Sequence, residues 1–144
     1  FVVPLQANTG TWASCLRQPA GGTPAYQNLQ HMYYISKRMV ISASHHLELS
    51  YPSKCSQLHG HNWTITVYCK ARELNRDGMV VDFKLIKERI ESQLDHANLN
   101  EVLPCNPTAE NIARWVCEQL PQCYRVDVQE SEGNLATYEK DKED

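Results

Sequence analysis

Two histidines in one predicted β-strand have a spacing that suits metal binding. His59 and His61 lie at the entry to the predicted strand 61–70, in which apolar and polar residues alternate. Side chains two residues apart on a strand point to the same side, about 6.5 to 7 Å apart, so both imidazoles can turn toward one ion. Trp63 shares their parity. That side is therefore predicted to face the core.

A third histidine lies in the preceding predicted strand, residues 33–46. His45 has the same parity as Ile41 and Ala43, whereas His46 has the opposite, polar parity. His45 is therefore the histidine predicted to face inward. If the two strands pair as neighbours, three neutral imidazoles converge and leave a fourth position open, which is the arrangement of a catalytic zinc site. The pattern indicates Zn²⁺ bound by the three inward-facing histidines, and the alternative is packed or surface histidines without a metal.

Cys55 lies four residues before His59, and its thiol leaves three interpretations open. As a fourth ligand it would close the metal site and make that site structural. Left unligated beside a cation, it would become a thiolate that acts as a base or nucleophile. The third interpretation is a small buried apolar residue, which is the role predicted for Cys69 and Cys117.

Asp95 and His96 are adjacent where the first predicted helix ends. A histidine at a helix end can act as a proton shuttle. Neighbouring residues on a regular helix diverge by about 100°, so a relay from Asp95 to His96 requires the helix to be ending there. The alternative is an exposed pair with no chemical role.

Glu130 is predicted to place a carboxylate on a core face. It shares the parity of Val126 and Val128, whereas Arg125 and Asp127 have the opposite parity. An unpaired buried carboxylate is costly, so Glu130 needs either an internal ion pair or a ligand with two parallel N–H donors.

The predicted elements follow the order strand, strand, helix, helix, strand, strand. Four strands with two helices on one face of an antiparallel sheet indicate an α+β fold. The predicted elements are strands over 33–46 and 61–70, helices opening at Asp82 and at Asn106-Pro107, and strands over 123–130 and 135–139.

Both predicted helices have recognisable start signals. Asp82 is expected to cap the first helix, and Asn106 is expected to cap the second, with Pro107 at its first position. Apolar residues recur in both helices at spacings of three and four. The predicted core faces contain Phe83, Ile86, Ile90 and Leu94 in the first helix, and Ile112, Ala113, Val116 and Leu120 in the second.

The 144 residues suffice for one domain. Residues 1–31 contain one charged side chain, Arg17, with three of the six glycines and three of the seven prolines. They are predicted to be an N-terminal extension or leader outside the fold, with the working domain at 32–139 and a charged tail at 140–144.

Charge and apolar content limit the expected partners and location. The net charge of −3 provides no basic excess for nucleic acid, and no apolar run is long enough to span a membrane. The six cysteines include no C-x-x-C pair. That absence disfavours a four-thiolate zinc site or a redox motif. Because the chain is too large and too rich in ordinary core residues to need disulfides, the cysteines are expected to be mostly reduced, in a cytoplasmic protein.

Taken together, six segments of the sequence resemble the 6-pyruvoyltetrahydropterin synthase family, in the family's order. Residues 1–31 have no counterpart in the family. The short interval in C-x3-H-G-H is similar to the bacterial 6-carboxytetrahydropterin synthase branch, which serves queuosine biosynthesis. The segments are ISASHHL at 41–47, CSQLHGHNW at 55–63, GMVVDF at 78–83, LDHANLN at 94–100, NPTAEN at 106–111 and VQES at 128–131.

The resemblance implies a zinc-dependent lyase of the tunnelling fold. It implies zinc on the three inward-facing histidines, Cys55 as proton acceptor and His96 with Asp95 as a relay. It further implies that Glu130 anchors the pterin ring, with Thr108 and Glu110 in the same pocket. The implied substrate is 7,8-dihydroneopterin triphosphate, which the carboxy-forming branch splits with release of acetaldehyde and triphosphate. The implied assembly is a homohexamer, a dimer of trimers with active sites between subunits. Pyruvoyl formation and a non-catalytic zinc-stabilised pterin-binding protein remain the alternatives.

Overall fold

The structure is a computed structural model that describes residues 31–141. The predicted N-terminal extension, except for its last residue, lies outside the described residues, as do 142–144 of the predicted tail. The strands are β1 (Tyr33–His45), β2 (His59–Ala71), β3 (Cys123–Ser131) and β4 (Asn134–Glu139); the helices are α1 (Phe83–Leu94), α2 (Leu99–Val102) and α3 (Ala109–Glu118), with a 3-10 turn, η3 (Lys54–Ser56).

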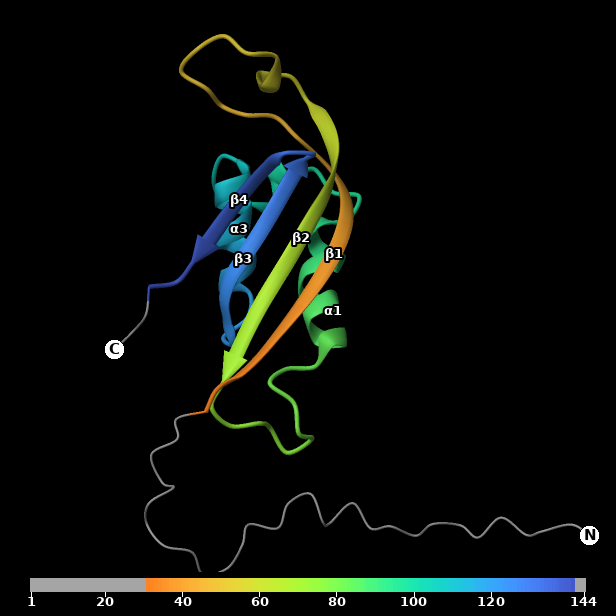
Figure 1. Cartoon of the computed structure of the whole chain (residues 1–144). Coiled ribbons are helices and arrows are strands. Elements are labelled where there is room, and N and C mark those ends of the chain that lie inside the picture. The colour runs from red at the N-terminus through yellow and green to blue at the C-terminus, as the bar shows by residue number, and fades with distance from the viewer. Residues whose placement is uncertain (1–30, 142–144) are drawn as a thin grey trace, which may run out of the picture. The chain divides into compact units, whose positions relative to one another are not determined.

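The four strands form one antiparallel sheet in the order β1-β2-β3-β4. The helices cover one face of this sheet, with α1 over β1 and α3 over β3 and β4 (Figure 1). This arrangement confirms the predicted α+β class and order of strands and main helices. The short helix α2 and the turn η3 are additional. Residues 46–58, here called the β1–β2 loop, extend beyond one end of the sheet (Figure 1).

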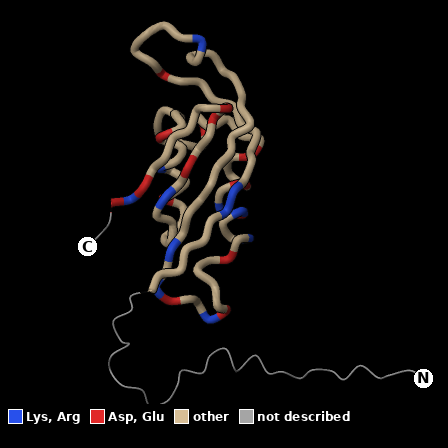
Figure 2. Tube along the Cα trace, viewed as in Figure 1, with Lys and Arg blue, Asp and Glu red and all other residues tan. Residues whose placement is uncertain are grey.

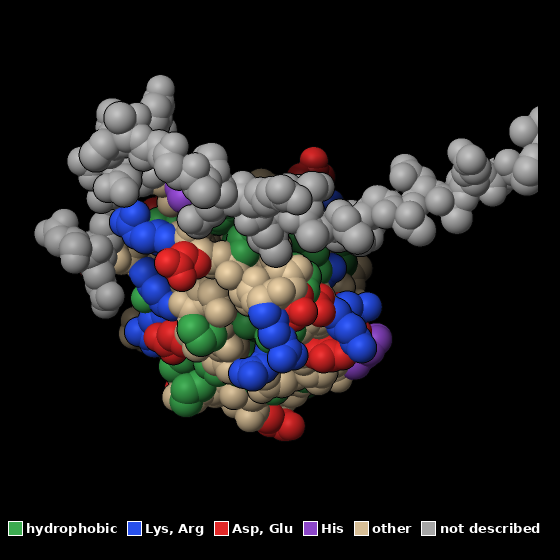
Figure 3. All heavy atoms as spheres, turned by 90° about the horizontal axis from the view of Figure 1, so that it is seen from below, with side chains coloured by type: hydrophobic (Ala, Val, Ile, Leu, Met, Phe, Trp, Pro, Cys, Tyr) green, Lys and Arg blue, Asp and Glu red, His purple; other side chains and the backbone are tan. Residues whose placement is uncertain are grey.

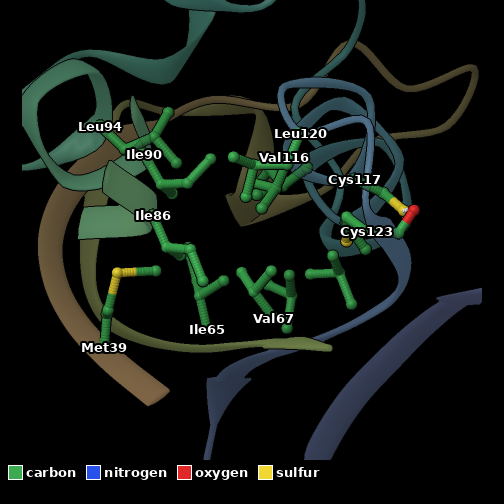
Figure 4. Packing of buried hydrophobic residues seen from close by; sticks show 14 of the residues in the cluster. Met39, Ile65, Val67, Ile86, Ile90, Leu94, Val116, Cys117, Leu120 and Cys123 are labelled. Carbon is green, nitrogen blue, oxygen red and sulfur yellow. Dashed lines mark hydrogen bonds between the residues drawn. The ribbon is translucent and has the colours of Figure 1, made fainter. Parts of the chain in front are cut away.

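The core lies between the sheet and the helices, as the alternation in the strands predicts. Ile65 and Val67 on β2 are fully buried and point toward Ile86 and Ile90 of α1 and Val116 of α3 (Figure 4). Burial of such side chains is the main source of stability for a domain of this size. The core parity of β2 is thus confirmed.

One residue of the predicted α1 core face is not buried. Ile86, Ile90 and Leu94 are fully buried, but Phe83 remains about half exposed. Phe83 is the first residue of α1, directly after the cap Asp82, whose side chain accepts a hydrogen bond from the backbone N–H of Lys84. The first turn of a helix lies at the edge of the packed layer, so the periodicity overestimated the core contact there.

The start of α3 differs from the prediction by two residues. The N-cap is Thr108, whose hydroxyl accepts from the backbone N–H of Asn111, and Asn106 lies outside the helix. The Asn106 side chain instead bonds both backbone groups of Glu48, at 3.0 Å each. The N-P pair therefore links α3 to the β1–β2 loop and does not begin the helix.

Charged residues of both signs are mixed over the described surface. Figure 2 shows acidic and basic positions interspersed along the strands and α1, and Figure 3 shows them beside scattered hydrophobic side chains at the lower end. Several form local pairs, among them Lys84 with Glu88 and Arg125 with Asp127. Within residues 31–141, no helix has the length and apolar character needed to span a membrane.

The segment after α1 contains a strained residue. His96 has φ 57°, the only positive φ of a non-glycine residue in the described part of the chain. Its backbone N–H donates to the carbonyl of Ser42 at 2.7 Å, and the Ser44 N–H donates to Ala97 O at 3.0 Å. These bonds hold the segment along the outer edge of β1. A left-handed backbone costs a non-glycine residue about 1–2 kcal/mol, which the bonds to β1 offset.

Truncation of Ile65 tests the packing of the central strand. Ile65→Ala is expected to lower the free energy of unfolding by about 3 to 4 kcal/mol, because it leaves a cavity in a fully buried site. Val40→Ala, on the exposed face of β1, is the matched control, with an expected change below about 1 kcal/mol. Urea unfolding followed by circular dichroism measures both; equal losses would contradict the described core.

The strain at His96 predicts an order of stability for two substitutions. His96→Gly is expected to be more stable than His96→Ala by about 1 kcal/mol, because glycine adopts positive φ without the steric cost that alanine keeps. Both substitutions remove the same imidazole, so the difference reports the backbone alone. Thermal unfolding of the two variants measures it, and an alanine variant at least as stable as the glycine variant would exclude the left-handed conformation.

Candidate metal centre and adjoining cavity

The three predicted ligands lie together at one end of the sheet. The β1–β2 register pairs His45 with His59 and Ala43 with His61, so the last residue of β1 meets the first residues of β2. One ring nitrogen from each of the three histidines lies within 4.8 Å of the others. His45 is fully buried. The inward orientation of His45, predicted from strand parity, is confirmed.

Two backbone carbonyls determine which ring nitrogens face inward. The Nδ1 of His45 lies 2.8 Å from Pro107 O, and the Nδ1 of His59 lies 2.7 Å from Gln57 O. A carbonyl oxygen can only accept, so each Nδ1 carries the proton and each neutral ring leaves Nε2 as a bare acceptor. Hydrogen bonds of this kind orient histidine ligands in metal sites.

The inward-facing nitrogens fit a metal ion. The Nε2 atoms of His45 and His59 lie 3.2 Å apart, and two lone pairs at this distance repel unless a proton or a cation lies between them. The Nε2 of His61 is buried and has no hydrogen-bond partner among the described residues. A tetrahedral ion bound at about 2.0 to 2.1 Å separates its nitrogen ligands by about 3.3 to 3.4 Å. The donor set therefore suits such an ion.

The environment of His45 favours its neutral, ligating form. Desolvation by burial lowers the pKa of His45 from the ordinary value of 6.5, and nearby His59 and His61 lower it further. The hydrogen bond to Pro107 O and the carboxylate of Glu130 oppose this shift. The net lowering keeps the ring unprotonated at neutral pH, as metal binding requires.

Glu130 lies directly beside the histidines. Its Oε1 is 3.5 Å from His45 Nε2 and 3.6 Å from His61 Nε2. The register of β3 with β4 shifts between Gln129 and Ser131, and such irregularities re-aim side chains. The predicted core-facing carboxylate is thus present, half-buried at the edge of the core.

Glu130 also lines a cavity of about 440 Å³, called here the Glu130 cavity. Thr108, the N-cap of α3, and Glu110, in the first turn of α3, line the same cavity. The structure therefore brings together the three residues predicted to contact a ring, and Glu130 connects them to the histidines. Cavities of this size accommodate small organic ligands.

Cys55 lies outside the histidine group. It is part of η3 in the β1–β2 loop, and its thiol is free and exposed. Within residues 31–141, the group of side chains close enough to share a metal comprises the three histidines alone. This placement favours the interpretation in which the thiol remains unligated. Cys69 and Cys117, predicted to be buried, are buried.

Asp95 and His96 lie apart from the Glu130 cavity. An Asp95 oxygen accepts from Ser42 N at 2.9 Å, and His96 is 84% exposed, with its Nε2 3.7 Å from Asp95. Among the described residues, no hydrogen bond or ion pair joins either residue to the three histidines or to Glu130. His96 lines a second cavity of about 400 Å³, which it shares with His61. Helix α1 ends at Leu94 with Asp95 as its C-cap, as a relay from Asp95 to His96 requires, but within a single chain the pair does not reach Glu130.

Several contributors to the site carry no sequence signal. The carbonyls of Pro107 and Gln57 act through the backbone, which every residue has. The hydrogen bonds between Asn106 and Glu48 were not predicted, because Asn106-Pro107 has the sequence pattern of a helix start. Tyr51, which lines the Glu130 cavity, belongs to no periodic pattern.

The chain is similar in sequence to curated pterin synthases. The chain is 28% identical over 136 residues to 6-carboxy-5,6,7,8-tetrahydropterin synthase of Bacillus subtilis (strain 168), covering 81% of this chain and 93% of the relative. It is 30% identical over 126 residues to 6-pyruvoyl tetrahydrobiopterin synthase of Dictyostelium discoideum, covering 72% and 93%.

The fold has a close counterpart among solved structures. The structure of Caenorhabditis elegans 6-pyruvoyl tetrahydropterin synthase matches with a TM-score of 0.62 and 25% identity, over 77% of this chain and 97% of that one. The expected tunnelling fold is thereby confirmed. Residues 34–141 match the family described as 6-pyruvoyl tetrahydropterin synthase. Because this match spans most of the sequence, the chain belongs to the 6-pyruvoyl tetrahydropterin synthase family.

Proposed function

We propose that the protein is a zinc-dependent lyase that converts 7,8-dihydroneopterin triphosphate to 6-carboxy-5,6,7,8-tetrahydropterin, releasing acetaldehyde and triphosphate. The observation that carries this proposal is the 3.2 Å approach of the His45 and His59 Nε2 atoms beside the Glu130 carboxylate. The similarity to the Bacillus subtilis relative supports the carboxy-forming reaction. On this proposal the enzyme serves queuosine biosynthesis.

Glu130 is proposed to anchor the bicyclic ring. A carboxylate can accept two parallel N–H bonds from the aminopyrimidine edge, which fixes both the orientation and the position of the ring. Thr108 and Glu110 line the same cavity and are proposed to contact the ring. The proposed ring site adjoins the metal centre, because Glu130 Oε1 lies 3.6 Å from His61 Nε2.

His45, His59 and His61 are proposed to hold Zn²⁺. Zinc bound there would supply Lewis-acid stabilisation of negative charge on the side-chain oxygens of the substrate. Cys55 is proposed to accept the proton that leaves the substrate side chain, since a thiolate near a bound cation is stabilised. The exposed position of Cys55 on the β1–β2 loop leaves the thiol accessible for this role.

Asp95 and His96 are proposed to return a proton to a site in a neighbouring copy. Their position on the outer edge of β1, away from Glu130, fits a role in another subunit. β1 and β4 are the two edge strands of the described sheet, and closure of such edges between copies removes unpaired backbone groups. We therefore propose a homohexamer, a dimer of trimers with active sites between subunits.

A pyruvoyl-forming reaction is the second candidate. The similarity to the Dictyostelium discoideum relative favours it. That reaction eliminates triphosphate and keeps every carbon of the side chain, whereas the carboxy-forming reaction releases two carbons as acetaldehyde. The released aldehyde therefore separates the two candidates.

Metal content tests the ligand assignment. Wild-type protein is expected to retain about one zinc per chain after gel filtration, and Cys55→Ala is expected to retain the same amount, because its thiol lies outside the histidine group. His59→Ala is expected to lose most of the zinc, since one of three protein ligands is gone. Plasma mass spectrometry measures the ratio. Loss of zinc in Cys55→Ala would favour a closed structural site in a non-catalytic pterin-binding protein.

Product analysis tests the reaction. Zinc-loaded protein incubated with dihydroneopterin triphosphate is expected to release acetaldehyde, triphosphate and the 6-carboxy product in equal amounts, measured by coupled NADH oxidation and mass spectrometry. Glu130→Gln is expected to lower kcat/KM by roughly 10- to 100-fold, because one charged acceptor is replaced by a neutral amide. A pyruvoyl product without acetaldehyde would support the second candidate, and unchanged kinetics in Glu130→Gln would refute ring anchoring.

A further inference from the structure

We propose that Tyr51 forms the stacking surface for the substrate ring in the Glu130 cavity, so that the β1–β2 loop positions both the ring and Cys55. This inference rests on the proposed function, because it takes a planar bicyclic ring as the occupant of the cavity. Tyr51 is a positioning residue in this account.

The lining of the Glu130 cavity suits a flat ring with polar edges. Glu130 supplies an acceptor at one position, and Leu47, Leu49 and Tyr51 contribute apolar surface from one segment of the β1–β2 loop. The hairpin between β3 and β4 and the start of α3 contribute both small residues, such as Gly133 and Ala109, and larger ones, such as Leu135. An apolar cavity with few polar groups that fix orientation is typical of sites for small organic ligands.

Tyr51 is an aromatic side chain without a partner in the described structure. It is 61% exposed and forms no hydrogen bond, ion pair or ring contact within residues 31–141. Aromatic rings of ligands stack on such side chains, and this stacking stabilises the bound ring without requiring a hydrogen bond. Within the Glu130 cavity, Tyr51 is the one aromatic side chain.

Hydrogen bonds close the base of the β1–β2 loop, the segment that carries Tyr51. Asn106 bonds both backbone groups of Glu48 at 3.0 Å, and Leu47 N donates to Cys55 O at 2.8 Å. Tyr51 therefore lies in a segment closed by the bond between Leu47 and Cys55. A ring stacked on Tyr51 and held by Glu130 is thus fixed relative to the Cys55 backbone.

Binding of pterin, the parent ring without a side chain at C6, tests the inference. With zinc-loaded protein, fluorescence titration is expected to give a Kd for Tyr51→Ala roughly tenfold or more above that of the wild type, because stacking is lost. Tyr51→Phe keeps the ring and is expected to stay within about twofold. With the full substrate, Tyr51→Ala is expected to raise KM and, through a misplaced side chain, to lower kcat, whereas Tyr51→Phe rescues both.

The matched control is Tyr34→Ala, because Tyr34 is 63% exposed and lies on β1 outside the Glu130 cavity. It is expected to leave pterin binding unchanged. Pterin affinity within twofold of the wild type in Tyr51→Ala, together with lost binding in Glu130→Gln, would overturn the Tyr51 role and leave the proposed function intact. Absence of pterin binding to the wild type would overturn both. A change of oligomeric state in Tyr51→Ala without a change in pterin affinity would assign Tyr51 to contact between copies.

Discussion

The candidate metal centre depends on two hydrogen bonds that are made away from it. Pro107 O and Gln57 O each hold an Nδ1 proton, of His45 and His59 respectively, so the opposite nitrogens face each other without protons. This arrangement has a repulsive cost in the protein alone. The repulsion persists because the two carbonyls belong to segments that other contacts hold in place. A cation bound between the nitrogens would replace the repulsion with coordination.

The residues of the candidate site meet at one end of the sheet. The β1–β2 register brings His45 opposite His59, and Glu130, at the irregularity in β3, lies beside His45 and His61. The approach to α3 supplies Pro107 O, while Asn106 fastens the β1–β2 loop that carries Cys55. The three histidines, Glu130 and Cys55 are therefore positioned by segments that are distant in sequence and meet through long-range contacts.

Strand parity was sufficient to predict which side chains face inward, because successive residues of a strand must alternate. It identified His45 over His46 and placed Glu130 on the core side. The prediction of Asn106 as a helix cap was wrong because its partner is distant in sequence. Asn106 bonds Glu48, and Thr108 is the N-cap of α3. The separation of His96 from Glu130 was likewise not predictable, because it depends on which edge of the sheet the chain follows after α1.

In the proposed site, three imidazole nitrogens bind zinc while the Cys55 thiol stays free. X-ray absorption at the zinc edge, on protein loaded with one equivalent of zinc, tests it most directly, since Zn–N bonds of about 2.0 to 2.1 Å are resolved from a Zn–S bond of about 2.3 Å. Three nitrogens and one oxygen from water are expected. A sulfur in the first shell, or fewer than three imidazoles, would contradict it.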